Sequence, residues 1–529
     1  MAFFKAIATV GGFTLASRLM GFIRDVLTAS FLGAGPVADA FFIALKLPNF
    51  FRRITAEGAF SVSFVPMFSK LLADEGPEEA KKFAEEAQAM MLAVLLPFTI
   101  ICMIAMPLVL YVIAPGVSND PTRYGLAITF TRITFPYILM MSLTALLGGV
   151  LNSFGRFAAF AAAPMFFNGI LIIALLFGSS LFKTSGHALA WGLAAAGVAQ
   201  FLWMLINYRM IGYVLRPRRP VLTPRIRKLF NLMIPGALGA GAAQINLFID
   251  MILASLLPVG SISFLYYADR LYQLPLGVIG VAIGTALLPM LSRALKKDGE
   301  EDPARLLGLA FETGLALSLP AAVGLIVIAN PVMSVLFERG EFSQADSIQS
   351  AHALVAYAMG LPAYVLARVF STAYFAREDT KTPVRFAIIC AIINTALALL
   401  FIGPLKHVGI ALATGLTAWV NLALLMRGLH RKRHLDLPPQ SVKRAWKIFG
   451  CGLAMAAVLW GINTFVVEGI VAGTALHRAL DLIFLIGAGG ASYFGGLYIC
   501  GIFNGQHIKA LFPKRKKQDT IGDVGQQGE

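Results

Sequence analysis

The chain has 529 residues, of which 58% are hydrophobic and only 14% are charged, and its formal net charge is +16. Soluble domains carry about 25% charged residues, so this composition excludes an ordinary soluble fold and indicates a membrane protein. The seven histidines and four cysteines show no metal-ligand or disulfide-framework spacing.

Apolar runs long enough to cross a membrane recur along the whole chain. The first begins close to the start of the chain, lacks a convincing cleavage site and contains two arginines, so we expect a retained helix rather than a signal peptide. We therefore predict an all-α polytopic membrane protein with about fourteen spans. They lie near 8–32, 37–68, 86–113, 124–152, 158–181, 188–208, 229–253, 262–292, 306–328, 346–375, 386–402, 408–426, 448–467 and 479–502.

The positions of the cations explain the basic composition. If the N-terminus is cytoplasmic, the cytoplasmic segments hold 31 Lys and Arg residues and the outside loops only five. This asymmetry follows the positive-inside rule and places both termini in the cytoplasm. The surplus charge therefore indicates topology, and we expect no nucleic-acid partner. The five outside cations are Arg123, Lys183, Arg339, Lys406 and Arg478.

The chain also resembles itself. The segment 64–70 matches 287–293, and 29–35 matches 254–260, with six predicted spans between the copies. Both copies therefore have the same orientation, which is a transporter design with a site between the repeats. We predict a first lobe over 1–210, a basic linker over 211–228, a second lobe over 229–430, two further spans within 431–502 and a polar tail over 503–529. Two hypotheses stay open for the linker, namely contact with anionic lipid and a solvated loop.

Eight basic residues fall inside the predicted spans. Such a residue costs roughly 2.5–3.5 kcal/mol on insertion scales, so it is usually paired or faces a water-filled cavity. Only six acids share the spans, and the cation surplus suits an anionic cargo such as phosphate, for which arginine offers paired donors. The cations are Arg18, Arg24, Lys46, Arg52, Arg53, Arg132, Arg270 and Arg368. The acids are Asp25, Asp39, Glu57, Asp250, Asp269 and Glu312.

The second span has a polar face. Asp39, Lys46 and Arg53 are seven residues apart, which places them on one side of a helix together with Asn49. Glu57 follows Arg53 by four residues and can pair with it. A competing hypothesis is therefore structural, in which Arg53–Glu57 and the neighbouring Arg24–Asp25 are neutralised pairs that hold the bundle together.

The eighth span supplies a matching face from the second lobe. It contains two tyrosines, Tyr266 and Tyr267, followed by Asp269 and Arg270. The internal repeat sets Arg270 opposite Lys46 across a central cleft. No catalytic motif or nucleotide-binding loop is present in the sequence, so we expect a transporter that uses an ion gradient or the membrane potential rather than an enzyme.

Five segments of the sequence resemble a known protein family. The segments SRLMGFIRD (17–25), DAFFIALKLPNFFRRITAEGAFSVSFVP (39–66), PYILMMSLTALLGGVLNSFGRF (136–157), YYADRLYQLPLGVIGVAIGTALLPMLS (266–292) and REDTKTPV (377–384) are similar to the MurJ (MviN) family. These are bacterial lipid II flippases of the MOP exporter superfamily. The resemblance runs from the first helix through the twelfth span at least.

The resemblance implies an inner-membrane protein that moves undecaprenyl-diphosphate-linked disaccharide-pentapeptide to the periplasmic leaflet by alternating access. It implies cargo contacts at Arg18, Arg24, Arg52 and Arg270, and cavity positions at Asn49, Arg53 and Ser263, with Lys46 on the same face. Asp25, Asp39, Glu57 and Asp269 are expected to form the gate, and Arg132 and Arg368 are further cavity candidates. Expected partners are lipid II, membrane phospholipids and proteins of cell-wall synthesis, and the last two spans would hold the lipid tail.

Two departures from the family pattern concern ions and the gate. Gln273 stands where some relatives have an acid. Some relatives also bind sodium, for which Asp250, Asn394 and Thr414 are candidates here, although Ala398 replaces a second acid. No other cofactor is expected. The alternative functions are a polysaccharide-lipid or multidrug exporter of the same superfamily, a membrane enzyme acting on polyprenyl phosphates, and a scaffold of the cell-wall machinery.

Overall fold

The computed structural model describes residues 2–214, 216, 218–295, 302–434, 437–472 and 474–502; within them, side chains are described outside 2–8, 55–58, 238–240, 242–243, 281, 465–472 and 475. The described chain is helical and contains no strand, which confirms the all-α class.

The first lobe consists of α1 (Ala2–Leu32), α2 (Pro36–Arg52), the π-helix η1 (Arg53–Phe60), α3 (Ser61–Asp74), α4 (Pro77–Ile104), α5 (Met106–Ile113), the 3-10 helix η2 (Pro115–Asn119), α6 (Pro121–Thr134), α7 (Tyr137–Ser153), α8 (Phe157–Ile173), the π-helix η3 (Ala174–Gly178) and α9 (Ser185–Arg209). The second lobe follows with α10 (Pro224–Ser255), α11 (Ser261–Pro275), the π-helix η4 (Leu276–Gly280), α12 (Val281–Ala294), α13 (Pro303–Val327), α14 (Ala329–Phe337), α15 (Gln344–Ala358), α16 (Leu361–Phe375) and α17 (Lys381–Arg431). The chain ends with α18 (Pro439–Ala472) and α19 (Ala475–Ile499).

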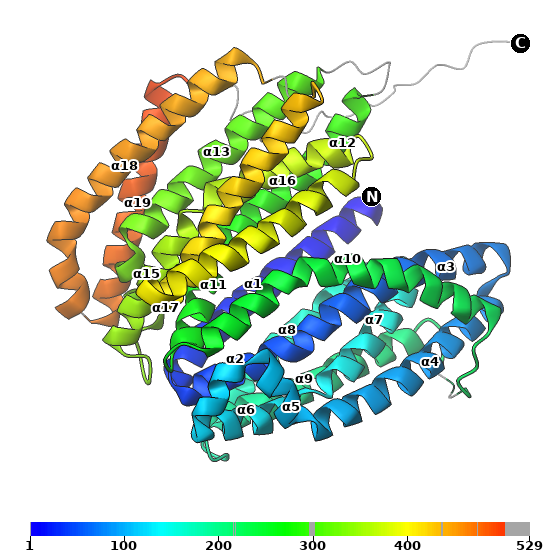
Figure 1. The fold of residues 1–529 in the computed structure, drawn as a ribbon. Helices are drawn as coiled ribbons and strands as arrows, with labels where there is room; N and C mark the ends of the chain where they lie inside the picture. The colour runs from blue at the N-terminus through cyan, green and yellow to red at the C-terminus, as the bar shows by residue number, and fades with distance from the viewer. Residues whose placement is uncertain are drawn as a thin grey trace, which may run out of the picture.

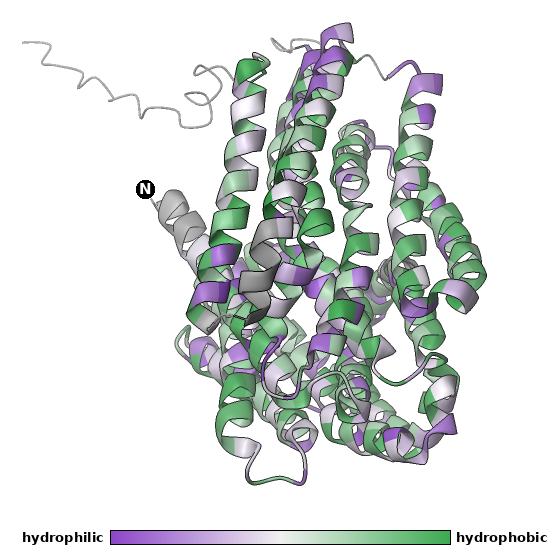
Figure 2. Cartoon of the chain, turned by 90° about the vertical axis from the view of Figure 1, so that its left-hand side faces the viewer, coloured by the Kyte–Doolittle hydropathy of each residue, from purple (hydrophilic) through white to green (hydrophobic). Residues whose placement is uncertain are grey.

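Ten helices of the described chain are long and apolar enough to cross a membrane. One of them, α17, contains two of the predicted spans, because its backbone breaks at Lys406 (φ 50°, ψ −129°). The predicted spans 8–32, 37–68 and 229–253 are not among the ten, yet each is helical, as α1, α2–η1–α3 and α10. The protein is therefore a multi-pass membrane protein, and hydrophobic residues predominate along its helices (Figure 2).

The internal repeat is visible in the backbone. Both copies consist of a helix, a π-helical turn and a second helix, namely α2–η1–α3 and α11–η4–α12. The π-helices begin at Arg53 and Leu276, which are as far apart as the matching Phe64 and Leu287. Because π-helical turns bend a helix and are frequent at functional sites, both lobes place a bend at the same point of the repeat.

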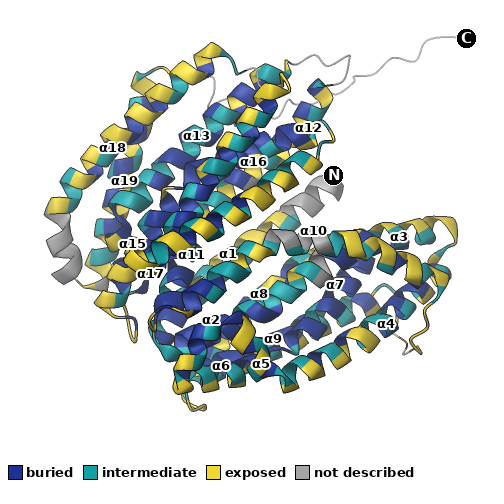
Figure 3. Cartoon of the chain, in the orientation of Figure 1, coloured by how far each residue is buried: buried dark blue, intermediate teal, exposed yellow. Residues whose placement is uncertain are grey.

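The two lobes contact each other at one end and diverge at the other (Figure 1). Contacts between them join α2 to α11 and α1 to α14. The ribbons separate toward α3 and α12 (Figure 1). Buried residues concentrate inside each lobe and where the lobes meet (Figure 3). We call the joined end the closed side.

Helix α10 packs against both lobes. Near its start, Ile226 and Leu229 are buried in a cluster with Phe60 and Phe64 of the first lobe. Near its end, Met251 belongs to the main core. The last two helices pack on the second lobe, where α18 and α19 contact α13. The predicted boundary at 229 therefore falls within a helix that contacts both lobes.

Prolines inside membrane helices free backbone carbonyls, and polar side chains from neighbouring helices satisfy them. Pro48 cannot donate to the carbonyl of Ala44, which instead accepts from Thr134 Oγ1 at 2.9 Å. Pro320 likewise frees the carbonyl of Ala316, which accepts from the hydroxyl of Tyr493 at 3.0 Å. The second bond fixes α19 against α13.

Replacing Tyr493 with Phe is expected to destabilise the protein by about 1 kcal/mol, because the carbonyl of Ala316 loses its partner inside a packed helix pair. Thermal unfolding in detergent measures the change. Tyr498→Phe on the same helix is the matched control, since Tyr498 is 70% exposed. Equal melting temperatures for the two variants would contradict the assignment.

Candidate functional site

Asp39 forms the centre of the contact between the lobes. Its carboxylate is completely buried (0% exposed) in the first turn of α2. It accepts hydrogen bonds from the backbone N–H of Gly260 at 2.8 Å and of Ser263 at 3.0 Å, and from the Ser263 hydroxyl at 2.7 Å. Gly260 and Ser263 form the N-terminus of α11, so an acid of one lobe caps a helix of the other. We call these contacts the gate.

Arg123 completes the gate, although its position in the sequence suggested an outside loop. The structure places it in the first turn of α6, only 3% exposed, with Nη1 3.3 Å from Asp39 Oδ2. Its Nη2 donates to the carbonyls of Gly116 at 3.3 Å and Ser255 at 3.1 Å. The signal for this helix was Asp120-Pro121, an N-cap followed by proline at the first helical position.

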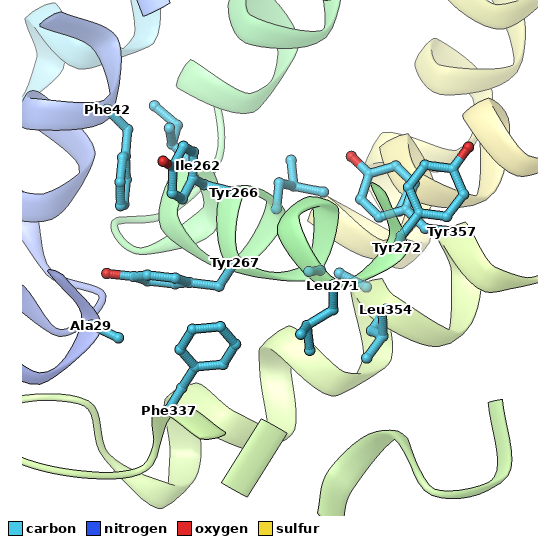
Figure 4. Packing of buried hydrophobic residues seen from close by; sticks show 14 of the residues in the cluster. Ala29, Phe42, Ile262, Tyr266, Tyr267, Leu271, Tyr272, Phe337, Leu354 and Tyr357 are labelled. Carbon is cyan, nitrogen blue, oxygen red and sulfur yellow. The ribbon is translucent and has the colours of Figure 1, made fainter. Parts of the chain in front are cut away.

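Aromatic side chains pack beside the gate. Phe42 of α2 stacks on Tyr266 of α11 with ring centroids 3.8 Å apart, and Figure 4 shows the two rings face to face. The hydroxyl of Tyr267 donates to the carbonyl of Gly33 at 3.0 Å. Gly33 has φ +62° and also touches the backbone of Glu341, so a side chain would not fit there. The closed side is therefore a packed interface.

Arg24 and Asp25 form an ion pair at the edge of this interface. The Arg24 Nη2 to Asp25 Oδ1 distance is 2.6 Å, and Arg24 Nη1 donates to Asn168 Oδ1 at 2.9 Å. Asp25 also accepts from the hydroxyl of Tyr266 at 3.2 Å, which joins α1 to the second lobe. In this conformation the predicted cargo ligand Arg24 is thus neutralised, as the structural hypothesis expected.

Arg270 is less firmly bound than Arg24. Its guanidinium lies over the Tyr266 ring, 4.7 Å from the centroid, and 3.9 Å from Asp269 Oδ2. Its Nε is buried and has no hydrogen-bond partner among the described residues. Asp269 instead accepts a short hydrogen bond from Gln273, the residue that departs from the family pattern. The Arg270 side chain is nevertheless partly exposed, so its guanidinium can donate to a further ligand.

The polar face of the second span contains the other predicted cavity residues. Asn49 Oδ1 accepts from Arg52 Nε at 3.1 Å, so these two residues support each other. Lys46 and Arg52 are partly exposed and Arg53 is exposed. The side chain of Glu57 lies outside the described residues, so its predicted pair with Arg53 stays a prediction. Ser263 differs from the expected cavity position because its hydroxyl is buried in the gate.

The remaining cations have separate surroundings. Arg18 reaches the second lobe, since a methyl group placed on Gly277 would lie 3.1 Å from its Nη1. Arg18 also lines a cavity of about 430 Å³ between α1, α7 and α8. Arg368 is exposed and packs over Gly284 of α12. Arg132 donates to the carbonyl of Met103 at 2.9 Å, a carbonyl freed by Pro107, so a structural role accounts for this cation.

The sodium candidates come together only in part. Asn394 Nδ2 donates to Asp250 Oδ1 at 3.2 Å, while Asn394 Oδ1 is buried without a partner among the described residues. The Thr414 hydroxyl donates within its own helix to Ile410. An amide oxygen beside a carboxylate suits a hard cation, so the Asp250–Asn394 pair fits part of a sodium site.

The basic linker contacts protein. Arg218 lies 2.5 Å from the buried Glu85, and Arg225 lies 2.7 Å from both Glu75 and Glu79. These acids belong to the end of α3 and the start of α4. Of the two hypotheses for the linker, neither foresaw these ion pairs, which join it to the first lobe.

The segment 377–384 leads into the start of α17 and contacts the residue that follows the end of this helix. Asp379 accepts from the backbone N–H of Thr382 at 3.0 Å and pairs with Lys432 at 2.5 Å. The Lys432 ammonium lowers the pKa of Asp379 to about 2. Because α17 folds back at Lys406, this pair closes the ends of a helical hairpin.

Comparisons with known proteins agree with this architecture. A sequence model described as "Lipid II flippase MurJ" matches residues 28–480. A probable lipid II flippase MurJ of Rhizobium meliloti is 42% identical over 93% of both chains, and that of Vibrio cholerae is 36% identical over 94% of this chain and 96% of the relative. A solved lipid II flippase MurJ in an inward closed conformation is 26% identical, with a TM-score of 0.76 over 92% of this chain and 99% of that one. An inward-facing multidrug MATE transporter shares the fold at 15% identity and TM-score 0.67, covering 82% and 99% of the two chains.

Proposed function

The chain belongs to the MurJ family of lipid II flippases, and we propose that it carries lipid II from the cytoplasmic to the periplasmic leaflet of the inner membrane. The cargo is the undecaprenyl-diphosphate-linked precursor of peptidoglycan. The cation distribution supports cytoplasmic termini, which makes the closed side periplasmic. The function is transport, and no step of chemical catalysis is part of the proposal.

The observation that carries this proposal is a group of cations contributed by both lobes. Arg24 of α1 pairs with Asp25, which accepts from the Tyr266 hydroxyl, and Arg270 of α11 lies over the Tyr266 ring. Arg18 reaches across from α1 to η4. A diphosphate diester carries two negative charges, and two oxygens of one phosphate can accept the two parallel donors of an arginine.

The cargo step follows from the partners of these cations. A diphosphate entering from the cytoplasmic side first meets the available donors of Arg270. It then competes with Asp25 for Arg24, whose ion pair with Asp25 also holds the Tyr266 hydroxyl of the second lobe. Binding of the cargo therefore changes one contact between the lobes, which couples cargo binding to the arrangement of the lobes.

The driving force is assigned to the membrane potential or to a sodium gradient. The sequence contains no nucleotide-binding loop, so we do not assign the driving force to ATP bound by this chain. The Asp250–Asn394 pair lies between α10 and α17, and α10 also contacts the first lobe. A cation bound there would join these helices, so its occupancy would bias the arrangement of the lobes.

Transport of purified lipid II into vesicles tests the function. Proteoliposomes containing the protein should make lipid II accessible to an enzyme added on the opposite side, and protein-free vesicles should not. A fluorescent cationic drug offered to the same vesicles tests the multidrug alternative. Transport of the drug without movement of lipid II would overturn the proposal.

A further inference from the structure

We propose that Arg123 is a positioning residue of the periplasmic gate, which together with Asp39 clamps two helix ends of the second lobe. The inference rests on the proposed orientation of the gate. It needs no assumption about the cargo. Arg123 binds Asp39 of α2, Gly116 of η2 and Ser255 of α10 through one guanidinium.

The charges of the first lobe match the helix ends that they touch. Helix α10 ends at Ser255 and α11 begins at Ser261. A helix carries a partial negative charge at its C-terminus and a partial positive charge at its N-terminus. Arg123 binds the carbonyl of Ser255, and Asp39 binds the first N–H groups of α11. Each charge therefore meets the helix end of opposite sign.

The backbone contact beside Arg123 shows how closely this clamp fits. Gly116 donates its N–H to Ser255 Oγ at 3.2 Å and accepts from Arg123 through its carbonyl. A Cβ at Gly116 would lie only 2.2 Å from the carbonyl oxygen of Ser255. The chain segments thus touch backbone to backbone, with the guanidinium bridging their carbonyls.

Opening the gate breaks the hydrogen bonds that Asp39 and Arg123 make to the second lobe. Ser255, Gly260 and Ser263 move with the second lobe, whereas Asp39 and Arg123 both belong to the first. The ion pair between Asp39 and Arg123 then remains and its charges stay balanced. In the open state water surrounds the pair, so its contribution is small. In the closed state Arg123 makes buried, charge-assisted bonds, which contribute more. Losing Arg123 therefore favours the open gate.

Labelling of a single cysteine tests the clamp. The four native cysteines are replaced, and Ser261→Cys supplies a reporter at a position that is 3% exposed in the closed gate. A membrane-impermeant maleimide is added from the periplasmic side. Arg123→Gln should raise the labelling rate about tenfold or more, as expected for losing a hydrogen bond to a charged group. Arg123→Lys should give an intermediate rate, because it keeps the charge without the planar fork.

The matched control is Lys183→Gln, which removes a cation from an exposed outside loop. Its labelling rate should equal that of the parent. An unchanged rate in Arg123→Gln would overturn the proposal. If that variant does not accumulate, Arg123→Lys decides the question, and a parental rate there overturns it as well. Because the labelling requires no lipid II, its outcome is independent of the transport assay.

Discussion

Asp39→Asn should reduce lipid II translocation by a factor of about one hundred or more, because it breaks a buried ion pair whose loss typically costs 3–5 kcal/mol. The carboxylate accepts from two backbone N–H groups, a hydroxyl and Arg123, so both of its oxygens are occupied. An asparagine would turn an NH₂ group toward one of these donors. The periplasmic gate would then close poorly, and alternating access requires that one side be shut.

Vesicle transport and cysteine labelling together measure the effect of Asp39→Asn. Transport should fall while labelling of Ser261→Cys from the periplasmic side rises. Asp346→Asn is the matched control, since Asp346 is a partly exposed acid of the capping box that begins α15 within one lobe. It should change transport little. Slower labelling in Asp39→Asn would show that the carboxylate does not hold the gate shut.

A double-mutant cycle links this prediction to Arg123. If Asp39 and Arg123 act through one contact, Asp39→Asn combined with Arg123→Gln should open the gate hardly more than the stronger single variant does. Additive effects on the labelling rate would instead indicate that Asp39 and Arg123 hold the second lobe through two independent contacts.

The charged faces could be proposed from the sequence because they follow from helical spacing. Asp39, Lys46 and Arg53 repeat every seven residues, and a charge inside an apolar run is visible without a structure. The family resemblance then indicated the cargo. The partners of Asp39 could not be predicted in this way, since two of them are backbone amides that any residue type could supply.

The internal repeat held more information about the gate than its sequence matches showed. Asp39 and Ser263 occupy matching positions in the two copies, as do Lys46 and Arg270. In the structure the first of these pairs is in direct contact. Residues at equivalent repeat positions approach each other where the two lobes meet. Pairing equivalent positions would therefore have predicted the Asp39–Ser263 contact.

Other features depend on tertiary context. Arg132 looked like a cavity cation on cost alone, but the carbonyl of Met103 that it satisfies is freed by a proline on another helix. Arg123 was assigned to a loop because hydropathy alone placed the start of its helix too late. For Arg132 the missing information was the neighbouring backbone, whereas for Arg123 the Asp120-Pro121 signal in the sequence was overlooked.

Arg270→Gln should also nearly abolish lipid II translocation, and for a different reason from Asp39→Asn. The Arg270 side chain is 34% exposed and lies 3.9 Å from the Asp269 carboxylate, so its charge is available to a ligand. Losing charge-assisted bonds to a diphosphate costs about 1.5–3 kcal/mol each, so a bidentate contact predicts a loss of two or more orders of magnitude in affinity. Gate labelling should remain near the parental rate.

Arg270→Lys separates charge from geometry at this position. Lysine keeps the positive charge but lacks the planar fork, so it should restore only part of the transport. Arg293→Gln on α12 is the matched control, because Arg293 is exposed and donates to the carbonyl of Pro289 in its own helix. Binding of lipid II to the purified variants measures the affinity directly. Parental affinity in Arg270→Gln would show that the diphosphate binds elsewhere, whereas full rescue by lysine would mean that the site recognises charge without the bidentate geometry.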